Sequence, residues 1–123
     1  AEKQGYSKFG SYTGNGNANG TFIYTGFKPA FFLQKKSSAS GSYWNIWGYT
    51  SLSGSNPIGR RLFPNVTAAE SSQDSSPMAD FCSNGVKLRQ TDADYNGSGV
   101  TYIYMAFAEN PFTSSTGTPV TAR

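Results

Sequence analysis

Apolar side chains alternate on both faces of the segment 101–112 (TYIYMAFAENPF). Read as a strand, the segment carries two apolar faces, with Ile103, Met105 and Phe107 on one and Tyr102, Tyr104 and Ala106 on the other. A strand that is apolar on both faces belongs in the middle of a packed sheet. Pro111 cannot donate a ladder hydrogen bond, so we expect the strand to end there.

Shorter segments rich in β-branched and aromatic residues are also predicted to be strands: 6–13, 21–25, 30–36, 43–50, 79–82 and 86–89. The last two form the strongest local signal, because Asn84-Gly85 separates two runs of period two. This pattern predicts a β-hairpin with a type I′ turn, in which both central residues have positive φ. The tract 14–20 (GNGNANG) and residues 91–99 are predicted to be polar loops.

Residues 51–77 are the least regular part of the chain, with prolines at 57, 64 and 77. One short strand is expected at 61–63, and residues 67–73 have the composition of a helical turn without an apolar stripe. The pattern as a whole predicts an all-β fold, an antiparallel, jelly-roll-like β-sandwich with one long irregular central loop. We expect a single domain over residues 1–112, followed by an extended C-terminal tail over 113–123.

Charged residues make up only 14% of the chain, and the net charge is +3. The positive charges are scattered, whereas nucleic-acid binding requires a clustered basic face, so no nucleic-acid partner is predicted. The doublets Lys35-Lys36 and Arg60-Arg61 are either solvated charges or contacts to an anionic partner. No apolar run approaches the length of about 20 residues that spans a membrane, so no insertion is expected.

The residues that usually carry catalysis are missing or misplaced. The chain has no histidine, which removes the commonest general base and the commonest zinc ligand. Asp92, Asp94 and Asn96 faintly resemble a calcium loop, but Ile103 stands where the bidentate glutamate would be, and we interpret the aspartates as exposed turn residues. Cys82 is expected to be a buried, inert thiol. The sequence therefore predicts no enzyme, no cofactor and no metal.

Four large aromatic residues lie within seven positions: Tyr43, Trp44, Trp47 and Tyr49. Alternation places Tyr43, Trp47 and Tyr49 on one face of their strand and Trp44 on the other. Two interpretations stay open for these rings. They form the core and a seam between domains or subunits, or one or two of them line a ligand groove, where aromatic rings stack on sugars.

Several motifs together resemble a domain of tailed-bacteriophage tail proteins: GYSKFGSYTGNGNANGTFIYTGFKPAFFLQKK, YWNIW, DFCSNGVKLR and TYIYMAFAENPF, in this order. The resemblance covers about Gly5 to Phe112. Such domains are found at the C-terminal end of tail fibres and related virion proteins, often in tandem, and their function is poorly defined. GYSKFGSYTGNG is similar to the start of a later repeat. Since Ala1-Glu2 matches Ala108-Glu109 at the end of the last strand, we expect the chain to be a unit of a longer tandem protein.

The resemblance implies a non-enzymatic domain of the extracellular virion, at the distal end of a tail fibre. There it would contact the host cell surface, a glycan or another receptor, as part of a homo-oligomer. The residues favoured for this contact are Trp44, Trp47, Tyr49, Arg60 and Arg61. The alternative is a structural assembly or decoration module of the capsid or fibre, without a receptor role. That alternative predicts a large apolar patch that a neighbouring copy or another virion protein buries.

Overall fold

The computed structural model describes residues 2–49, 54–72, 76–111 and 114–116. These residues form nine strands, and none of them lies in an α-helix. The strands are β1 (Ser7–Thr13), β2 (Phe22–Tyr24), β3 (Pro29–Lys36), β4 (Asn45–Gly48), β5 (Arg60–Arg61), β6 (Ser71–Ser72), β7 (Ala79–Cys82), β8 (Gly85–Leu88) and β9 (Thr101–Ala108). The all-β prediction is confirmed.

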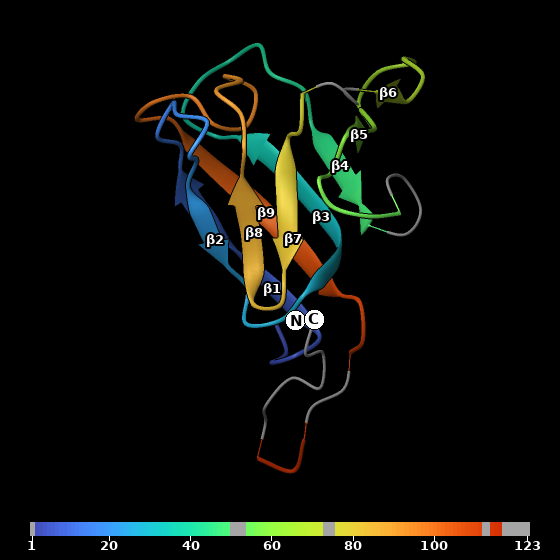
Figure 1. Cartoon of the computed structure of the whole chain (residues 1–123). Helices are drawn as coiled ribbons and strands as arrows, with labels where there is room; N and C mark the ends of the chain where they lie inside the picture. The colour runs from blue at the N-terminus through green and yellow to red at the C-terminus, as the bar shows by residue number, and fades with distance from the viewer. Residues whose placement is uncertain (1, 50–53, 73–75, 112–113, 117–123) are drawn as a thin grey trace.

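Two antiparallel sheets pack face to face (Figure 1). The larger has the order β1-β9-β3-β4, the smaller the order β2-β8-β7, and β5 and β6 form a separate two-stranded ribbon. The chain alternates between the larger and the smaller sheet from β1 to β2 to β3 and again from β8 to β9, as expected for a jelly-roll-like sandwich. Strand β9 lies between β1 and β3, so its predicted central position is correct.

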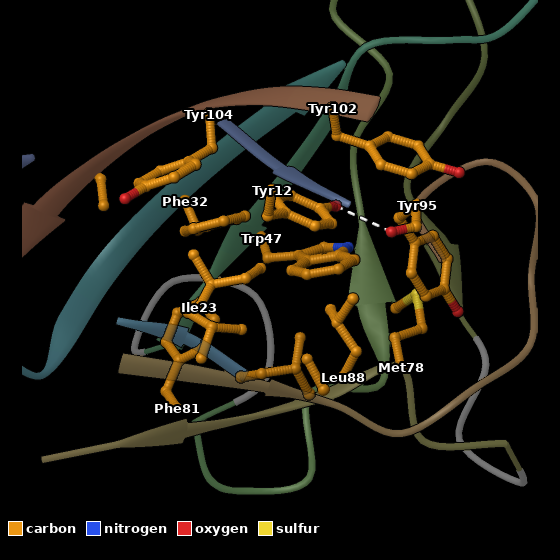
Figure 2. Packing of buried hydrophobic residues seen from close by; sticks show 14 of the residues in the cluster. Tyr12, Ile23, Phe32, Trp47, Met78, Phe81, Leu88, Tyr95, Tyr102 and Tyr104 are labelled. Atoms are coloured by element: carbon orange, nitrogen blue, oxygen red, sulfur yellow. Dashed lines mark hydrogen bonds between the residues drawn. The ribbon is translucent and has the colours of Figure 1, made fainter. Parts of the chain in front are cut away.

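Aromatic rings fill the space between the sheets (Figure 2). Phe32 of β3 lies between Tyr104 and Trp47, stacked on the first at 5.3 Å and on the second at 5.7 Å between ring centroids. Tyr95 meets the Trp47 ring edge-on at 5.0 Å. Aliphatic side chains of the smaller sheet, such as Ile23 and Leu88, close the core from the opposite side. Burial of these large rings is the main term that holds the sandwich together.

The β7–β8 hairpin is present, but its turn differs from the prediction. Cys82 pairs with Gly85, so the two loop residues are Ser83 and Asn84. No described residue other than glycine has positive φ, and Gly85 is not among the glycines that do. The type I′ prediction is therefore wrong. Gly85 is required for another reason: a Cβ there would lie 2.2 Å from the carbonyl oxygen of Ile23 on β2.

Replacing Gly85 with alanine is expected to destabilise the domain by about 1–3 kcal/mol, because β2 must shift away from β8 to admit the methyl group. Chemical denaturation of the variant and the wild type measures this difference. Asn84→Ala is the matched control, since it changes the exposed turn and leaves the β2–β8 contact intact. Equal losses in the two variants would contradict the steric role of Gly85.

The central excursion, predicted as residues 51–77, packs against the side of the sandwich wherever the structure describes it. Ile58 bridges to Ala79 of β7, and Leu62 bridges to Ile46 of β4. The side chain of Asn56 adds two hydrogen bonds of 2.8 Å to the backbone of Phe81, one to its N–H and one to its carbonyl. The excursion thus covers the free edges of both sheets on this side of the molecule.

Three predicted boundaries need correction. The short strand expected at 61–63 is Arg60–Arg61, and the helical turn expected at 67–73 is replaced by β6 at Ser71–Ser72, which pairs with β5. Strand β9 ends at Ala108 rather than at Pro111. The predicted boundary between the domain and its tail, at 112/113, lies outside the described residues, as does most of the tail.

Candidate functional site: the outer face of the larger sheet

Strand pairing brings apolar side chains into rows on the side of the larger sheet that points away from the smaller one. One row runs across all of its strands through Phe9, Met105, Leu33 and Ile46. The remaining apolar members of this surface are Phe31, Ile103 and Phe107, with Trp44 just before β4. We call these eight residues the outer face.

Aromatic side chains gather around Phe107 at one end of the outer face. Tyr6 and Phe9 meet this ring edge-on at centroid distances of 6.2 and 6.1 Å, and Phe31 lies at 5.9 Å. Near the other end the surface is hollowed. A hollow of about 290 Å³ lies over Leu33, Trp44 and Ile103, and a second of about 390 Å³ lies between Trp44 and the segment 64–65. Trp44 and Leu33 line both hollows.

The outer face is almost free of charge and of hydrogen-bonding side chains. Among the described residues that line the two hollows there is no carboxylate. Asn65 alone of them carries an amide, and its Oδ1 accepts the backbone N–H of Trp44 at 3.1 Å. Ser11 and Lys35 flank Ile103 in its row. An antiparallel sheet usually presents polar side chains on its solvent side. None of the described strands packs on this face, and 44% of Ile103 is therefore exposed.

Of the two predicted tryptophan contacts, only one lies at the surface. Trp44 is half-buried on the outer face, whereas Trp47 is completely enclosed in the core (Figure 2). A ring without exposed area cannot stack on a ligand, so the structure argues against Trp47 as a binding residue. The predicted separation of Trp44 from Trp47 onto opposite faces is correct.

Tyr49 lies outside the outer face and is engaged with other side chains. The Lys28 ammonium lies 3.7 Å from the centroid of its ring, and the ring stacks on Phe81 at 6.3 Å. Lys28 is itself almost fully buried and forms an ion pair of 3.3 Å with Glu109. This arrangement fixes the end of β9 against the start of β3, and Tyr49 packs against the lysine that makes this connection.

The two predicted arginines diverge, because adjacent strand residues point to opposite sides. Arg60 is exposed and pairs with Glu70 at 2.9 Å. Arg61 is buried at the edge of the core, with Asp92 at 3.4 Å, Asp94 at 3.9 Å and the Phe63 ring at 4.9 Å. The expectation that both aspartates are exposed turn residues is therefore wrong. They are half-buried partners of a cation, and breaking such a partly buried pair costs more than breaking an exposed one.

The structure describes little that resembles a reactive centre. No three histidine, cysteine, aspartate or glutamate side chains gather in a metal-binding arrangement among the described residues. Cys82 is half-buried rather than buried, and burial is the main cause of the raised pKa of its thiol. A raised pKa lowers the fraction of reactive thiolate. In the described part of the chain no helix is long and apolar enough to cross a membrane.

The predicted loops at one end of the sandwich are tied to each other. Asn96 is buried, its Nδ2 donates to the carbonyls of Asn17 at 2.9 Å and Gln90 at 2.7 Å, and its Oδ1 accepts the N–H of Asn15 at 3.1 Å. Ser37 and Ser38 bond to Thr101 nearby. The glycine- and asparagine-rich tract is therefore fastened to the loop before β9.

A family model described as a domain of unknown function (DUF7483) matches residues 1–111. No curated protein and no solved structure matches the chain.

Proposed function

Because the chain belongs to the DUF7483 family, whose description states no activity, we propose from its geometry that it is a non-enzymatic assembly module. It attaches to another structural protein of its particle through the outer face. The particle is a bacteriophage virion in the setting that the motif resemblance implies.

The apolar outer face is the single observation that carries this proposal. The centres of protein interfaces are depleted in charged residues and enriched in aromatic residues and methionine. Phe9, Phe31, Trp44, Met105 and Phe107 fit that composition, and Lys35 with Ser11 supplies part of a polar rim. Exposure of apolar surface to water is unfavourable by about 25 cal/mol for each Å², and a protein partner that buries the surface recovers this free energy. The described residues around the hollows include no carboxylate and one amide, that of Asn65, which fits a protein partner better than a hydrated glycan.

Contact with a glycan on the host surface is the second candidate, and the position of Trp44 favours it. Trp44 is half-buried and lines both hollows, the second of them together with Pro64 and Asn65. Sugars stack on such rings, but they also need hydrogen-bonding groups around them. The predicted partners Arg60 and Arg61 point elsewhere, to Glu70 and to the Asp92–Asp94 pair. The receptor hypothesis therefore depends on Trp44 among the predicted residues.

Photo-crosslinking in the intact particle tests the proposal. We expect p-benzoylphenylalanine in place of Ile103, which is 44% exposed on the outer face, to crosslink to a structural protein of the particle. The same group in place of Tyr24, which is 65% exposed on β2 of the smaller sheet, is the matched control and is expected to give no such product. Mass spectrometry identifies the partner, and circular dichroism confirms that both variants fold.

Two outcomes would overturn the assembly function. The first is a particle that contains the domain and gives no protein crosslink at position 103. The second is a crosslink at position 103 only when host cells are added, which would favour the receptor function instead. Trp44→Ala then separates the two readings, since it should abolish cell adhesion if Trp44 stacks on a glycan.

A further inference from the structure

The free edge of β1 differs from the edges of β4 and β7. The edges of β4 and β7 are covered by the excursion through Leu62, Ile58 and Asn56. On the opposite side, β1 is the outermost strand of its sheet (Figure 1). It forms its ladder with β9, and among the described residues Lys3 bridges its free edge at Ser7. Gly10, Ser11 and Thr13 are exposed, and residues 9–11 (FGS) carry no lysine, proline or bulge of the kind that usually blocks an edge.

The alternation of the backbone decides which groups point to this open edge. The carbonyl of Tyr6 and the N–H of Gly14 bond toward β9, to Ala108 and Val100. Since alternate residues of a strand direct their backbone groups to the same side, the even-numbered residues of β1 bond to β9. The N–H and carbonyl groups of Phe9, Ser11 and Thr13 therefore point away from the sheet.

Two of these six groups are already occupied. The Glu2 carboxylate accepts a hydrogen bond from the Lys8 ammonium at 2.6 Å, and its pKa is lowered first by this bond and further by one from the backbone N–H of Phe9. The carbonyl of Thr13 accepts the Thr21 hydroxyl at 2.7 Å. For the carbonyl of Phe9, both groups of Ser11 and the N–H of Thr13, the described residues supply no partner.

The four remaining groups complement themselves under a two-fold axis. In an antiparallel pairing centred on Ser11, each Ser11 N–H meets the carbonyl of the other Ser11, and each Thr13 N–H meets the carbonyl of the other Phe9. Every remaining group is then used. Sliding the partner by two residues in either direction leaves one symmetric pair of bonds instead of two, because the Glu2 and Thr21 side chains hold the groups that the shifted registers need.

The side chains agree with this register. Ser11 faces Ser11 across the axis, a small neutral pair without charge repulsion, and Phe9 faces Thr13 on the same side. On the inner side Gly10 lies opposite Tyr12 of the other copy, and Gly10 contributes no bulk. We propose that two copies of this chain associate through their β1 edges, antiparallel and centred on Ser11, into one continuous sheet.

This pairing does not depend on the proposed assembly function, but it enlarges the surface for it. Phe9 ends the apolar row of the outer face at the β1 edge. Since side chains of paired strands keep their side of the sheet, the outer faces of both copies lie on one side of the joined sheet.

Complementary charges at position 11 test the pairing by sedimentation velocity over a range of concentrations. We expect the wild type to reach twice the mass of the chain, S11K and S11E each to remain monomeric under the same conditions, and an equal mixture of S11K and S11E to recover the dimer. Like charges facing each other across the axis oppose pairing, and opposite charges favour it. Ser83→Lys and Ser83→Glu, in the exposed turn between β7 and β8, are the matched controls and are expected to remain dimeric.

Circular dichroism confirms that each variant folds, so that loss of the dimer is not loss of the domain. A wild type that stays monomeric at every concentration overturns the inference, and so does a dimer that survives in S11K and S11E alone. A dimer lost in both single variants and not recovered in their mixture excludes the register centred on Ser11. The crosslinking experiment at Ile103 keeps Ser11 unchanged, so failure of the pairing and failure of the assembly function give different results.

Discussion

Replacing Trp47 with alanine is expected to lower the free energy of unfolding by about 3–5 kcal/mol, the cost of deleting a large aromatic side chain from a core. The indole has no exposed area and is held between the Phe32 ring at 5.7 Å and the Tyr95 ring at 5.0 Å (Figure 2). The Phe32 ring cannot close the space, because β3 is held between β4 and β9. Since domains of this size have a total stability of about 5–15 kcal/mol, the loss consumes a large share of it. Urea unfolding followed by circular dichroism measures the difference.

The chain supplies its own control in Trp44, the same residue type three positions earlier on the opposite face of the sheet. Trp44→Ala is expected to cost about 1 kcal/mol or less, because the ring is half-buried at the surface. Fluorescence reports on the two rings separately, since the indole in the core should emit at shorter wavelength than the one on the outer face. Similar stability losses in the two variants would contradict the division between core and outer face.

Stability is expected to fall steeply above pH 10 because of two buried tyrosines. Burial is the main cause that raises the pKa of Tyr12 and of Tyr95 above its ordinary value near 10. Above pH 10 the unfolded chain has lost these protons while the folded chain keeps them, so raising the pH favours unfolding. The stabilisation is complete below about pH 10 and is lost as the pH rises toward the folded pKa values. Each tyrosine contributes about 1.4 kcal/mol per pH unit, or about 2.7 kcal/mol for both.

Tyr12→Phe isolates one of these contributions. The substitution removes the hydroxyl that donates to the Tyr95 carbonyl at 2.8 Å, so a loss of about 1 kcal/mol is expected at neutral pH. Above pH 10, however, the stability of the variant should fall less steeply than that of the wild type by about 1.4 kcal/mol per pH unit. Denaturation at a series of pH values from 8 to 12 gives both slopes. Parallel curves would show that Tyr12 ionises alike in the folded and unfolded states.

Much of the fold follows from the alternation of side chains along the chain. The pattern around Tyr102 to Phe107 predicts a central strand, and β9 is central because both of its faces are apolar. The hairpin at 79–88 is also predicted correctly, but its turn is not. Asn84-Gly85 favours a type I′ turn by local propensity, whereas the structure uses Gly85 for the close approach of β2. That contact joins residues distant in sequence, so no local pattern contains it.

The candidate site is harder to predict for the same reason. Alternation separates Trp44 from Trp47 but does not tell which side of the strand faces the core, because both sides are apolar. Arg61 looks like a surface charge until Asp92 and Asp94, about thirty positions later, are folded against it. The apolar side of β9 at Ile103, Met105 and Phe107 was visible in the sequence. None of the described strands covers this side. The packing of the whole domain decides this, and the sequence of the segment does not contain it.

The buried amide of Asn96 has a consequence for the end of the sandwich where the polar loops meet. Glycine and asparagine usually make a loop flexible, yet here the enclosed side chain of Asn96 ties its own loop to the tract at Asn15 and Asn17 and to Gln90 just after β8. The loops at this end are already ordered in the folded domain. A molecule that binds there would not have to order them, so less affinity is lost to conformational entropy on binding. Ala18 and Ser98, in the same two loops, are exposed, so they can be replaced by other residues. New specificities could be grafted there while the scaffold keeps its shape.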